Sequence, residues 1–319
     1  MSQKQILALS GGVGGAKLAL GLARVLPADK LTIVCNTGDD FEHLGLKICP
    51  DLDTVTYTLA GRSHPEQGWG LANESWRVME SLRELQGETW FNLGDKDLAT
   101  HLLRSQLLRQ GLSLGAVTQH LTTAMGVAQK VLPMSDDNVS TSVLTDKGVL
   151  AFQHYFVRER CAPAVRGFVF SGADHARPHP ELLRLLASDE LGAVVICPSN
   201  PFLSVDPMLA LTGVRAALRQ CAAPVIAVSP IVGGKAIKGP TAKILQELNL
   251  PCNAATVAEH YRDIIDGFLL DQVDEAHMPV IAALGVAART TNTVMRSLAD
   301  REQLARTCLS FAASLAQGL

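Results

Sequence analysis

Short, almost continuously apolar runs alternate with amphipathic stretches along most of this 319-residue chain. Residues 6–9, 31–35, 193–197 and 225–228 form such runs, and each is followed by a polar or glycine-rich turn. A parallel sheet that helices cover on both faces requires strands of this kind, because neither face of the sheet meets water. The pattern predicts a Rossmann-like, doubly wound α/β fold with a mostly parallel sheet. Residues 167–170 are expected to add another strand to it.

The stretch from residue 62 to residue 147 has a weaker strand signal, and helical periodicity dominates there, as in 98–109. We therefore expect a single Rossmann-like α/β domain over residues 1–319, with 62–147 as a mainly helical insert or cap. Residues 148–157 are expected to form a strand that returns the chain to the core. Near the end of the chain, 301–315 has the pattern of a surface helix.

Composition narrows the class of protein. The chain carries 28 basic and 31 acidic side chains, a formal charge of −3, and only 5% of its residues are aromatic. Without a basic block or stacking aromatics, nucleic acid is not expected as a partner. No apolar run approaches the roughly 18 residues that a membrane span needs, and the polar start does not have the pattern of a signal peptide. We therefore expect a cytoplasmic protein that acts on small molecules and has no membrane partner.

A glycine-rich turn, Ser10-Gly-Gly-Val-Gly-Gly-Ala-Lys17, links the first predicted strand to the first predicted helix. At such a turn the free backbone N–H groups and the helix dipole attract anions, and glycine lets the backbone approach a phosphate closely. Lys17 adds a positive charge, but it stands where the dinucleotide fingerprint has its third glycine, which disfavours an NAD-dependent dehydrogenase. The turn also departs from the P-loop, and a tight turn without a ligand is the alternative. We expect phosphate binding through Gly11, Gly12, Gly14, Gly15 and Lys17.

Four aspartates follow the second predicted strand: Asp39, Asp40, Asp51 and Asp53. Carboxylates that converge on one crevice suit a hard cation such as Mg²⁺, which takes oxygen ligands and bridges to substrate phosphates. Two alternatives stay open for single members of the group. Asp51 or Asp53 can cap the helix that starts near residue 50, and an aspartate after the second strand can hold a ribose hydroxyl.

The segment Asn92–Asp97 precedes the predicted helix 98–109, on which His101 and Arg104 lie three residues apart. A capped helix with a charged first turn explains the segment without any ligand. The two side chains on the helix can face the same side as the loop, but a solvated helix face explains them equally well.

Two later strand ends carry prolines and hydrogen-bonding side chains. Ser199 and Asn200 follow the run that ends at Cys197, and Ser229 follows the run that ends at Val228. Prolines fix the conformation of such loops, and Ser and Asn offer hydrogen bonds to a purine or a ribose. As plain turns they need no ligand, but open α/β sheets bind ligands at the carboxyl ends of their strands. No nucleophile motif accompanies these residues, so positioning and charge neutralisation, which suffice for phosphoryl transfer, are the expected mechanism.

Seven short segments stand in order along the chain: Gly11–Lys17, Asn36–Asp40, Pro50–Thr54, Gly94–Asp97, Pro133–Asp137, Pro198–Pro201 and Ser229–Ile231. In that order they resemble the 2-phospho-L-lactate transferase family of coenzyme F420 biosynthesis. Each segment alone is a weak signal, whereas the ordered set is specific. The resemblance runs from about residue 5 to beyond residue 300.

The resemblance implies a reaction that no residue spacing shows. The terminal ribityl hydroxyl of the deazaflavin Fo would attack the phosphorus that bears a small acid in a guanosine diphosphate-linked donor. Mg²⁺ would be the cofactor and GMP the leaving group. Members of the family differ in the acid, which is phospholactate, phosphoenolpyruvate or 3-phosphoglycerate. The resemblance also implies a homodimer with a Rossmann-like core.

Carried over residue by residue, the resemblance assigns the donor and the metal to named groups. Gly11–Lys17 would hold the donor diphosphate, and the guanosine would lie against Ser199, Asn200 and Ser229. The aspartates would hold Mg²⁺, in the order of expectation Asp39, Asp53, Asp40 and Asp51.

On the acceptor side, the resemblance gives Asp53 a second role as orienter or base for the incoming hydroxyl, with Asp39 as the other catalytic group. Asn92 and Lys96 would assist on the deazaflavin side. Lys96 stands where many relatives have arginine, so no bidentate contact is expected there. The three tryptophans all lie within 69–90, in the predicted cap, where they either form a wall for the flat deazaflavin ring or pack in a core.

A rival interpretation is a non-catalytic regulatory protein of the same fold that binds nucleotide sugars or dinucleotides. Such proteins share a similar glycine turn but resemble this chain less at Pro50–Thr54 and Gly94–Asp97. Release of GMP only in the presence of Fo would separate the two interpretations.

Overall fold

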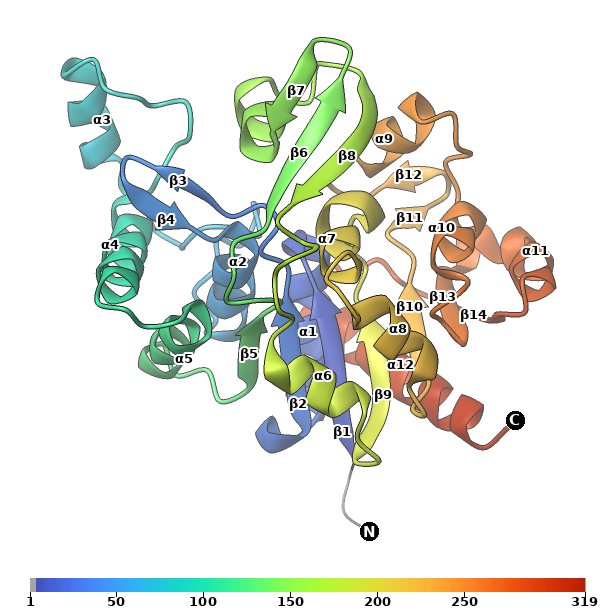
Figure 1. Cartoon of the computed structure of the whole chain (residues 1–319). Coiled ribbons are helices and arrows are strands. Elements are labelled where there is room, and N and C mark those ends of the chain that lie inside the picture. Colours follow the sequence, from blue (N-terminus) through green and yellow to red (C-terminus); the bar gives the residue numbers. More distant parts are fainter. Residues whose placement is uncertain (1–3, 319) are drawn as a thin grey trace.

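A seven-stranded sheet forms the centre of the molecule, and its strands follow the order β14-β13-β10-β9-β1-β2-β5 (Figure 1). The computed structural model describes residues 4–318 of the chain. Every pairing in this sheet is parallel, which confirms the predicted doubly wound α/β fold. The strands are β1 (Gln5–Ser10), β2 (Leu31–Cys35), β5 (Lys130–Pro133), β9 (Leu191–Ile196), β10 (Val225–Val228), β13 (Gly267–Asp271) and β14 (Ala287–Thr291).

The strands of this sheet send side chains into two hydrophobic cores, because successive residues of a strand point to opposite faces. In β1, Leu7 and Leu9 enter one core, whereas Ile6 and Ala8 enter the other. Helices cover both faces, so the strands have continuous apolar sequences. The helices on the face of Ile6 are α1 (Gly12–Val25), α2 (Pro50–Leu59) and α12 (Leu298–Ala316), and those on the opposite face are α6 (Pro180–Leu186), α7 (Asp206–Leu209), α8 (Val214–Gln220), α10 (Ala254–Tyr261) and α11 (Met278–Ala283).

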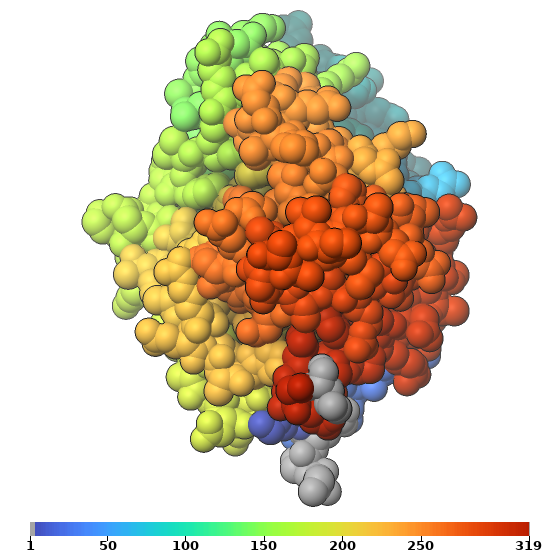
Figure 2. Space-filling view, turned by 90° about the vertical axis from the view of Figure 1, so that its right-hand side faces the viewer, coloured from blue at the N-terminus to red at the C-terminus, as the bar shows by residue number. Residues whose placement is uncertain are grey.

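The C-terminal helix α12 covers the sheet with one face and packs closely on α1. A capping box formed by Ser297 and Asp300 starts it, and Phe311 is buried. Gly21 on α1 permits the close approach, because a Cβ there would lie 2.2 Å from the carbonyl oxygen of Arg301. In the view of Figure 2, the last quarter of the chain, coloured orange to red, covers the centre of the visible face.

The strand order reverses between β1 and β9. From β1 the chain builds outward through β2 and β5, and it returns later on the other side of β1 with β9, β10, β13 and β14. In open α/β sheets, ligands bind outside the carboxyl ends of the strands at such a reversal. The two loops that meet there are the glycine turn after β1 and Pro198–Asn200 after β9.

The predicted insert at 62–147 is helical as far as residue 124, with α3 (Arg77–Glu84), α4 (Asp95–Arg109) and α5 (Leu114–Ala124). Its last part differs from the prediction, because β5 pairs with β2 as an edge strand of the central sheet and β6 (Ser140–Thr145) belongs to a second sheet. A four-residue edge strand that ends in proline carries little periodicity, so the pattern misses it. A hairpin of β3 (Phe41–His43) and β4 (Leu46–Ile48) packs beside α4.

Two predicted strands do not lie in the central sheet. Residues 167–170 belong to β8 (Val165–Ser171) and residues 148–151 form β7 (Gly148–Ala151), and both pair antiparallel with β6 in a three-stranded sheet at the top of Figure 1. The chain then turns helical at His154–Arg158, so the prediction of a strand over 148–157 that returns to the core is wrong. This sheet has a solvated face, on which Val149 and Val169 are exposed, so an apolar run here does not mean burial on both sides.

Short elements complete the fold near the carboxyl ends of the central strands. A hairpin of β11 (Ile231–Val232) and β12 (Lys235–Ala236) leads into α9 (Thr241–Glu247), and short helical turns lie at Ala28–Lys30, Pro201–Val205 and Gln272–His277. Among residues 4–318, no helix has the length and apolar character that crossing a membrane requires.

Candidate active site

A pocket of about 960 Å³ opens at the carboxyl ends of β1, β2, β9 and β10. Its lining comes from the glycine turn, the start of α2, the loops after β9, β10 and β14, and segments 67–70 and 90–92 of the predicted insert. Gly15, Asp40 and Lys96 are not part of the lining. The other predicted site residues all line the pocket: Gly11, Gly12, Gly14, Lys17, Asp39, Asp51, Asp53, Asn92, Ser199, Asn200 and Ser229.

The glycine turn has a geometry that side chains would disturb. Gly12, the first residue of α1, has a φ of 61°, in the left-handed region, and no atom within 4 Å of where a Cβ would stand. A Cβ on Gly14 would lie 2.2 Å from the carbonyl oxygen of Pro198, so this glycine lets α1 approach the loop after β9. Gly15 faces inward, where a Cβ would lie 2.6 Å from Ser10 Oγ. A side chain at this position would therefore disturb the packing of the turn, and the contact of Gly15 with phosphate stays a prediction.

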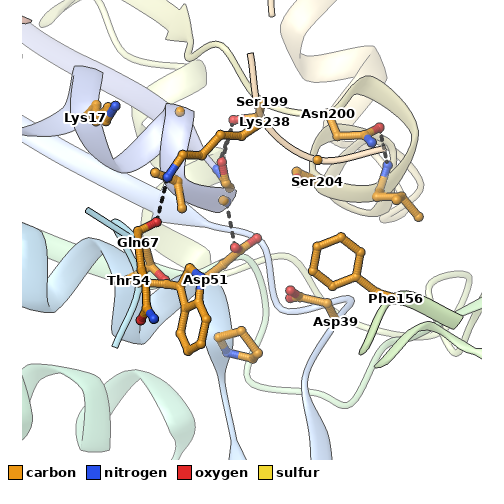
Figure 3. A pocket seen from close by; sticks show the side chains of 18 of the residues that line it. Lys17, Asp39, Asp51, Thr54, Gln67, Phe156, Ser199, Asn200, Ser204 and Lys238 are labelled. Carbon is orange, nitrogen blue, oxygen red and sulfur yellow. Dashed lines mark hydrogen bonds between the residues drawn. The ribbon is translucent and has the colours of Figure 1, made fainter. Parts of the chain in front are cut away.

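Asp39 and Asp51 form a carboxylate pair beside the glycine turn, turned toward the same space (Figure 3). The side-chain amide of Asn36 donates to Asp39 Oδ1 over 3.1 Å and to Asp51 Oδ2 over 3.0 Å. The N–H of Gly38 donates to Asn36 Oδ1 over 2.8 Å, which fixes the orientation of the amide. The N–H of Gly12 donates to Asp51 Oδ1 over 2.6 Å. Asp51 thus caps a helix, but the helix is α1 rather than its own helix α2.

Burial and mutual repulsion make this pair suitable for a cation. Burial raises the pKa of Asp51 to about 6. Burial, together with the charges of Asp51 and Asp40, raises the pKa of Asp39 well above its ordinary value. Two buried carboxylates need a counter-charge to ionise together at neutral pH, and a divalent cation that prefers oxygen ligands matches this donor set.

Asp40 lies outside the pocket lining. Among the residues that the structure describes, none donates a hydrogen bond to its carboxylate, and its ion-pair partner is Lys47, whose Nζ lies 3.8 Å from Oδ2. Burial raises the pKa of Asp40 to about 7. The structure therefore does not bring Asp40 to the predicted metal site.

Asp53 lies two residues beyond Asp51 on α2 but has a different partner. Arg104, on α4, donates to both oxygens of its carboxylate, with 3.1 Å between Nη1 and Oδ2. Arg104 is only 2% exposed. A guanidinium that donates to both oxygens neutralises the carboxylate and occupies one acceptor position on each oxygen, which weakens the attraction of Asp53 for a cation. This geometry disfavours the predicted roles of Asp53 as a metal ligand and as a base.

A buried charge network continues from Asp53. His101 and Arg104 are both buried, so the alternative of a solvated helix face is wrong. His101 Nδ1 lies 3.7 Å from Asp53 Oδ2, and Nε2 lies 3.4 Å from Asp97 Oδ1. Arg104 Nη1 lies 3.1 Å from His101 Nδ1, and because a guanidinium only donates, the ring proton lies on Nε2 and faces Asp97. Candidate ligand atoms of Asp53, Asp97 and His101 lie within 4.8 Å of one another, but Arg104 already supplies the positive charge there.

The start of α4 is capped from another segment. Glu74 accepts the N–H groups of Lys96 and Asp97, each over 2.9 Å. Lys96 is exposed, and its ammonium donates to the carbonyl oxygen of Ala72 over 3.0 Å, so it joins two parts of the insert rather than lining the pocket. Asn92 does line the pocket, as does Asp97, the last residue of the segment Gly94–Asp97, for which the sequence indicated no separate role.

The three residues that were predicted to contact guanosine, Ser199, Asn200 and Ser229, already form hydrogen bonds within the protein. Ser199 Oγ accepts from the N–H of Gly11 over 3.2 Å and donates to its carbonyl oxygen over 2.8 Å, which ties the loop after β9 to the glycine turn. Ser229 Oγ bonds to the backbone of Ile231. Asn200 Oδ1 caps the helical turn that follows it. Its Nδ2 is buried and has no hydrogen-bond partner among residues 4–318.

Aromatic side chains contribute to the pocket lining from four segments: Tyr57, Trp69, Trp90, Phe91, Phe152 and Phe156. Trp69 is 47% exposed, whereas Trp90 packs edge-on against His154 with ring centroids 4.7 Å apart. Phe152 and Phe156 stack with centroids 5.4 Å apart. Trp76 does not line the pocket. Trp69 and Trp90 thus line the pocket, no tryptophan among the described residues belongs to a buried core, and contact with a flat ring stays a prediction.

Cationic side chains line another part of the pocket: Lys17, Lys238 and Arg296. Burial, and then the charges of neighbouring basic side chains, lowers the pKa of Lys17. Lys238 reaches from the loop after β12 to the insert, where its ammonium donates to the carbonyl oxygens of Gln67 over 2.7 Å and Glu66 over 3.2 Å (Figure 3). No sequence signal marks Lys238, because its position depends on the packing of segments far apart in the chain.

Known proteins have sequences similar to this chain over almost its whole length. A family model described as 2-phospho-L-lactate transferase CofD matches residues 6–307. A phosphoenolpyruvate transferase of Kitasatospora aureofaciens is 43% identical, over 98% of this chain and 99% of its own length. A 2-phospho-L-lactate transferase of Methanosarcina mazei is 37% identical, over 94% of this chain and 98% of its own length.

Solved structures share the fold at lower identity. The crystal structure of a member of the UPF0052 family from Bacillus halodurans matches with a TM-score of 0.62 and 16% identity, over 97% of this chain and 99% of that one. At this identity the likeness shows the fold alone.

Proposed function

Because the chain belongs to the 2-phospho-L-lactate transferase CofD family, we propose that it transfers a phospho-acid group in coenzyme F420 biosynthesis. The group is 2-phospho-L-lactate, phosphoenolpyruvate or 3-phosphoglycerate, and its carrier is a guanosine diphosphate-linked donor. The acceptor is the ribityl hydroxyl of the deazaflavin Fo, and the products are the F420-0-type precursor and GMP. The observation that carries this proposal is a single pocket that combines a glycine turn, a carboxylate pair and aromatic side chains.

The donor fits the side of the pocket formed by the glycine turn. The start of α1 offers backbone N–H groups and the positive end of a helix dipole to the diphosphate, and Gly14 brings this turn close to the loop after β9. Lys17 and Lys238 add positive charge to the same pocket. The Nδ2 of Asn200, on the loop after β9, has no hydrogen-bond partner among the described residues. A base with a carbonyl oxygen, such as guanine, would accept a hydrogen bond from it.

Mg²⁺ fits the pair of Asp39 and Asp51, which are oxygen donors whose pKa values burial raises and which a cation would neutralise. When bound, the ion would neutralise charge on the diphosphate oxygens as transfer proceeds. In this proposal Asp39 and Asp51 hold the cation, Asn36 sets the distance between their carboxylates, and Asp53 forms a neutral pair with Arg104.

Transfer needs little covalent chemistry from the protein. The acceptor oxygen forms a bond to the phosphorus that bears the acid, the bond from that phosphorus to the GMP oxygen breaks, and GMP leaves with the electron pair. The hydroxyl proton is released. Such a reaction depends mainly on in-line positioning and on stabilisation of charge at the phosphoryl oxygens.

The test uses the purified full chain with Mg²⁺, Fo and the three activated donors in competition. GMP release should require both Fo and a donor, and mass spectrometry of the product identifies the acid. Nucleotide binding without Fo-dependent GMP release would contradict the proposal and support the non-catalytic regulatory alternative. A homodimer is a further prediction from the family, which analytical ultracentrifugation checks.

A further inference from the structure

Asp97 is a pocket carboxylate that neither the metal pair nor the donor side uses. It is the third residue of α4, where a carboxylate often serves the free N–H groups of the helix start. Glu74 accepts the N–H groups of Lys96 and Asp97 instead. The side chain of Asp97 is therefore not needed as a cap.

One oxygen of the Asp97 carboxylate accepts a hydrogen bond within the protein, and the other accepts none from the described residues. Tyr57 donates to Asp97 Oδ1 over 2.5 Å, and His101 Nε2 lies 3.4 Å from the same oxygen. Arg104 holds the other side of the His101 ring through Nδ1. Nothing within residues 4–318 donates a hydrogen bond to Asp97 Oδ2, and the side chain is 17% exposed. Oδ2 is thus an acceptor that a ligand in the pocket can use.

The chemistry of this oxygen favours a hydroxyl. Burial raises the pKa of Asp97, but the contacts with His101 and Tyr57 and the charge of Arg104 outweigh it, so the pKa lies below its ordinary value. An ionised carboxylate only accepts hydrogen bonds, and it repels phosphate. A metal ion at this place would lie close to the guanidinium of Arg104, which repels it.

Asp97 lies beyond Asp53 as seen from Asp51. Ligand atoms of Asp53 and Asp97 lie within 4.8 Å of one another, and Asp53 follows Asp51 by two residues on α2. Tyr57, which donates to Asp97, follows one helical turn later. The terminal hydroxyl of the acceptor must reach the phosphorus near Asp51, so a group bound at Asp97 lies further back on the acceptor.

We propose that Asp97 Oδ2 accepts a hydrogen bond from a secondary hydroxyl of the acceptor's polyol chain, and that Tyr57 and His101 are positioning residues for this carboxylate. The inference rests on the proposed function, because it needs a polyhydroxylated acceptor. It adds Asp97, whose Oδ2 accepts from no described residue, to the acceptor side beside Asp53, which forms a neutral pair with Arg104.

Steady-state kinetics of the Asp97→Asn variant test the inference. Loss of a hydrogen bond to a charged group should raise the KM for Fo by about 10-fold to 100-fold. The KM for the donor and the affinity for Mn²⁺, used as a metal probe, should not change. Asp95→Asn is the matched control, because it removes the same charge two residues earlier on α4, outside the pocket, where the carboxylate accepts from Ser75. This control should leave the KM for Fo unchanged.

Two further measurements separate recognition of a hydroxyl from a structural role. An acceptor analogue without the secondary hydroxyls should bind the wild-type protein more weakly than Fo does, whereas the Asp97→Asn variant should bind both alike. Tyr57→Phe removes the hydroxyl that holds Asp97 and should raise the KM for Fo by a smaller factor. It carries the test if thermal melting shows that Asp97→Asn does not fold.

An unchanged KM for Fo in both variants overturns the inference, and so does an equal rise in the Asp95→Asn control. Loss of Mn²⁺ affinity in Asp97→Asn assigns the carboxylate to a cation and overturns it as well. These outcomes leave the proposed function intact. The proposed function fails only if the wild-type protein transfers no group to Fo, and the inference then fails with it.

Discussion

The guanidinium of Arg104 donates hydrogen bonds to both carboxylate oxygens of Asp53, and both side chains are buried. Removing two charges from water is costly, and the bidentate geometry together with contacts to the carbonyl oxygen of Lys47 and to His101 offsets this cost. The pair links α2, which starts beside the glycine turn, to α4, which carries Asp97. It therefore fixes the pocket wall between the carboxylates of Asp39 and Asp51 and that of Asp97.

The Arg104→Met variant should lose about 3–5 kcal/mol of unfolding free energy, because Asp53 is left buried without its partner. Urea unfolding followed by circular dichroism measures the loss. The double variant Arg104→Met with Asp53→Leu should recover part of it, since it removes both charges. A loss below about 1 kcal/mol in the single variant, as at a surface ion pair, would show that the network does not depend on this contact.

The metal should depend on Asp39 and Asp51 more than on Asp53. Asp39→Asn and Asp51→Asn should each weaken Mn²⁺ binding by at least about 10-fold, the loss that even outer-shell partners cause. Asp53→Asn should change it less, because Arg104 already holds that carboxylate. Isothermal titration calorimetry gives the three affinities, with Asp40→Asn as a buried control outside the pocket. An equal loss in Asp53→Asn would restore Asp53 as a metal ligand.

Asp40 and Asp51 should make the metal-free protein less stable as the pH rises toward 8. Their pKa values of about 7 and about 6 lie above the ordinary aspartate value near 3.9. Between about pH 4 and pH 7 the folded chain thus binds more protons than the unfolded chain, so the contribution of these groups to stability falls as the pH rises.

The Asp40→Asn variant isolates one part of this dependence. It should be more stable than the wild-type protein at pH 8, by up to about 4 kcal/mol, because the penalty of ionising a buried carboxyl is removed. At pH 4 both proteins are uncharged at this position when folded, so little difference is expected. Thermal melting in EDTA at the two pH values measures the effect. The same gain at both pH values would contradict the assignment to ionisation.

Lys238 should matter for the donor because it connects its own loop to segment 64–70 over the glycine turn. Its ammonium donates to two carbonyl oxygens of that segment, and a Cβ on Gly68 would lie 2.6 Å from Val13 Cγ1. Lys238→Met should raise the KM for the donor by about 10-fold and speed hydrogen exchange in 64–70. Lys235→Met, an exposed lysine outside the pocket, is the control. Unchanged exchange would show that the segment is held by other contacts.

Whether a strand could be assigned to the central sheet from the sequence depended on whether both of its faces are buried. The strands β1, β2, β9 and β10 are buried on both faces, so an apolar run of the right length identifies each one. The same kind of run at Gly167–Phe170 lies in a sheet with one solvated face, because its partner is the antiparallel strand β6. The identity of a strand's partner depends on residues far away in the chain, which no local pattern contains.

The sequence by itself determined the family, the doubly wound sheet and the glycine turn after the first strand, because each depends on the local order of residue types. The partners of the aspartates were decided only by the tertiary structure. Asp51 and Asp53 lie two residues apart on α2, so their side chains leave the helix about 200° apart. One therefore meets Gly12 and the other meets Arg104, 39 and 51 residues away along the chain. Spacing in the sequence groups these carboxylates, whereas the direction of each side chain turns Asp51 toward the glycine turn and Asp53 toward Arg104.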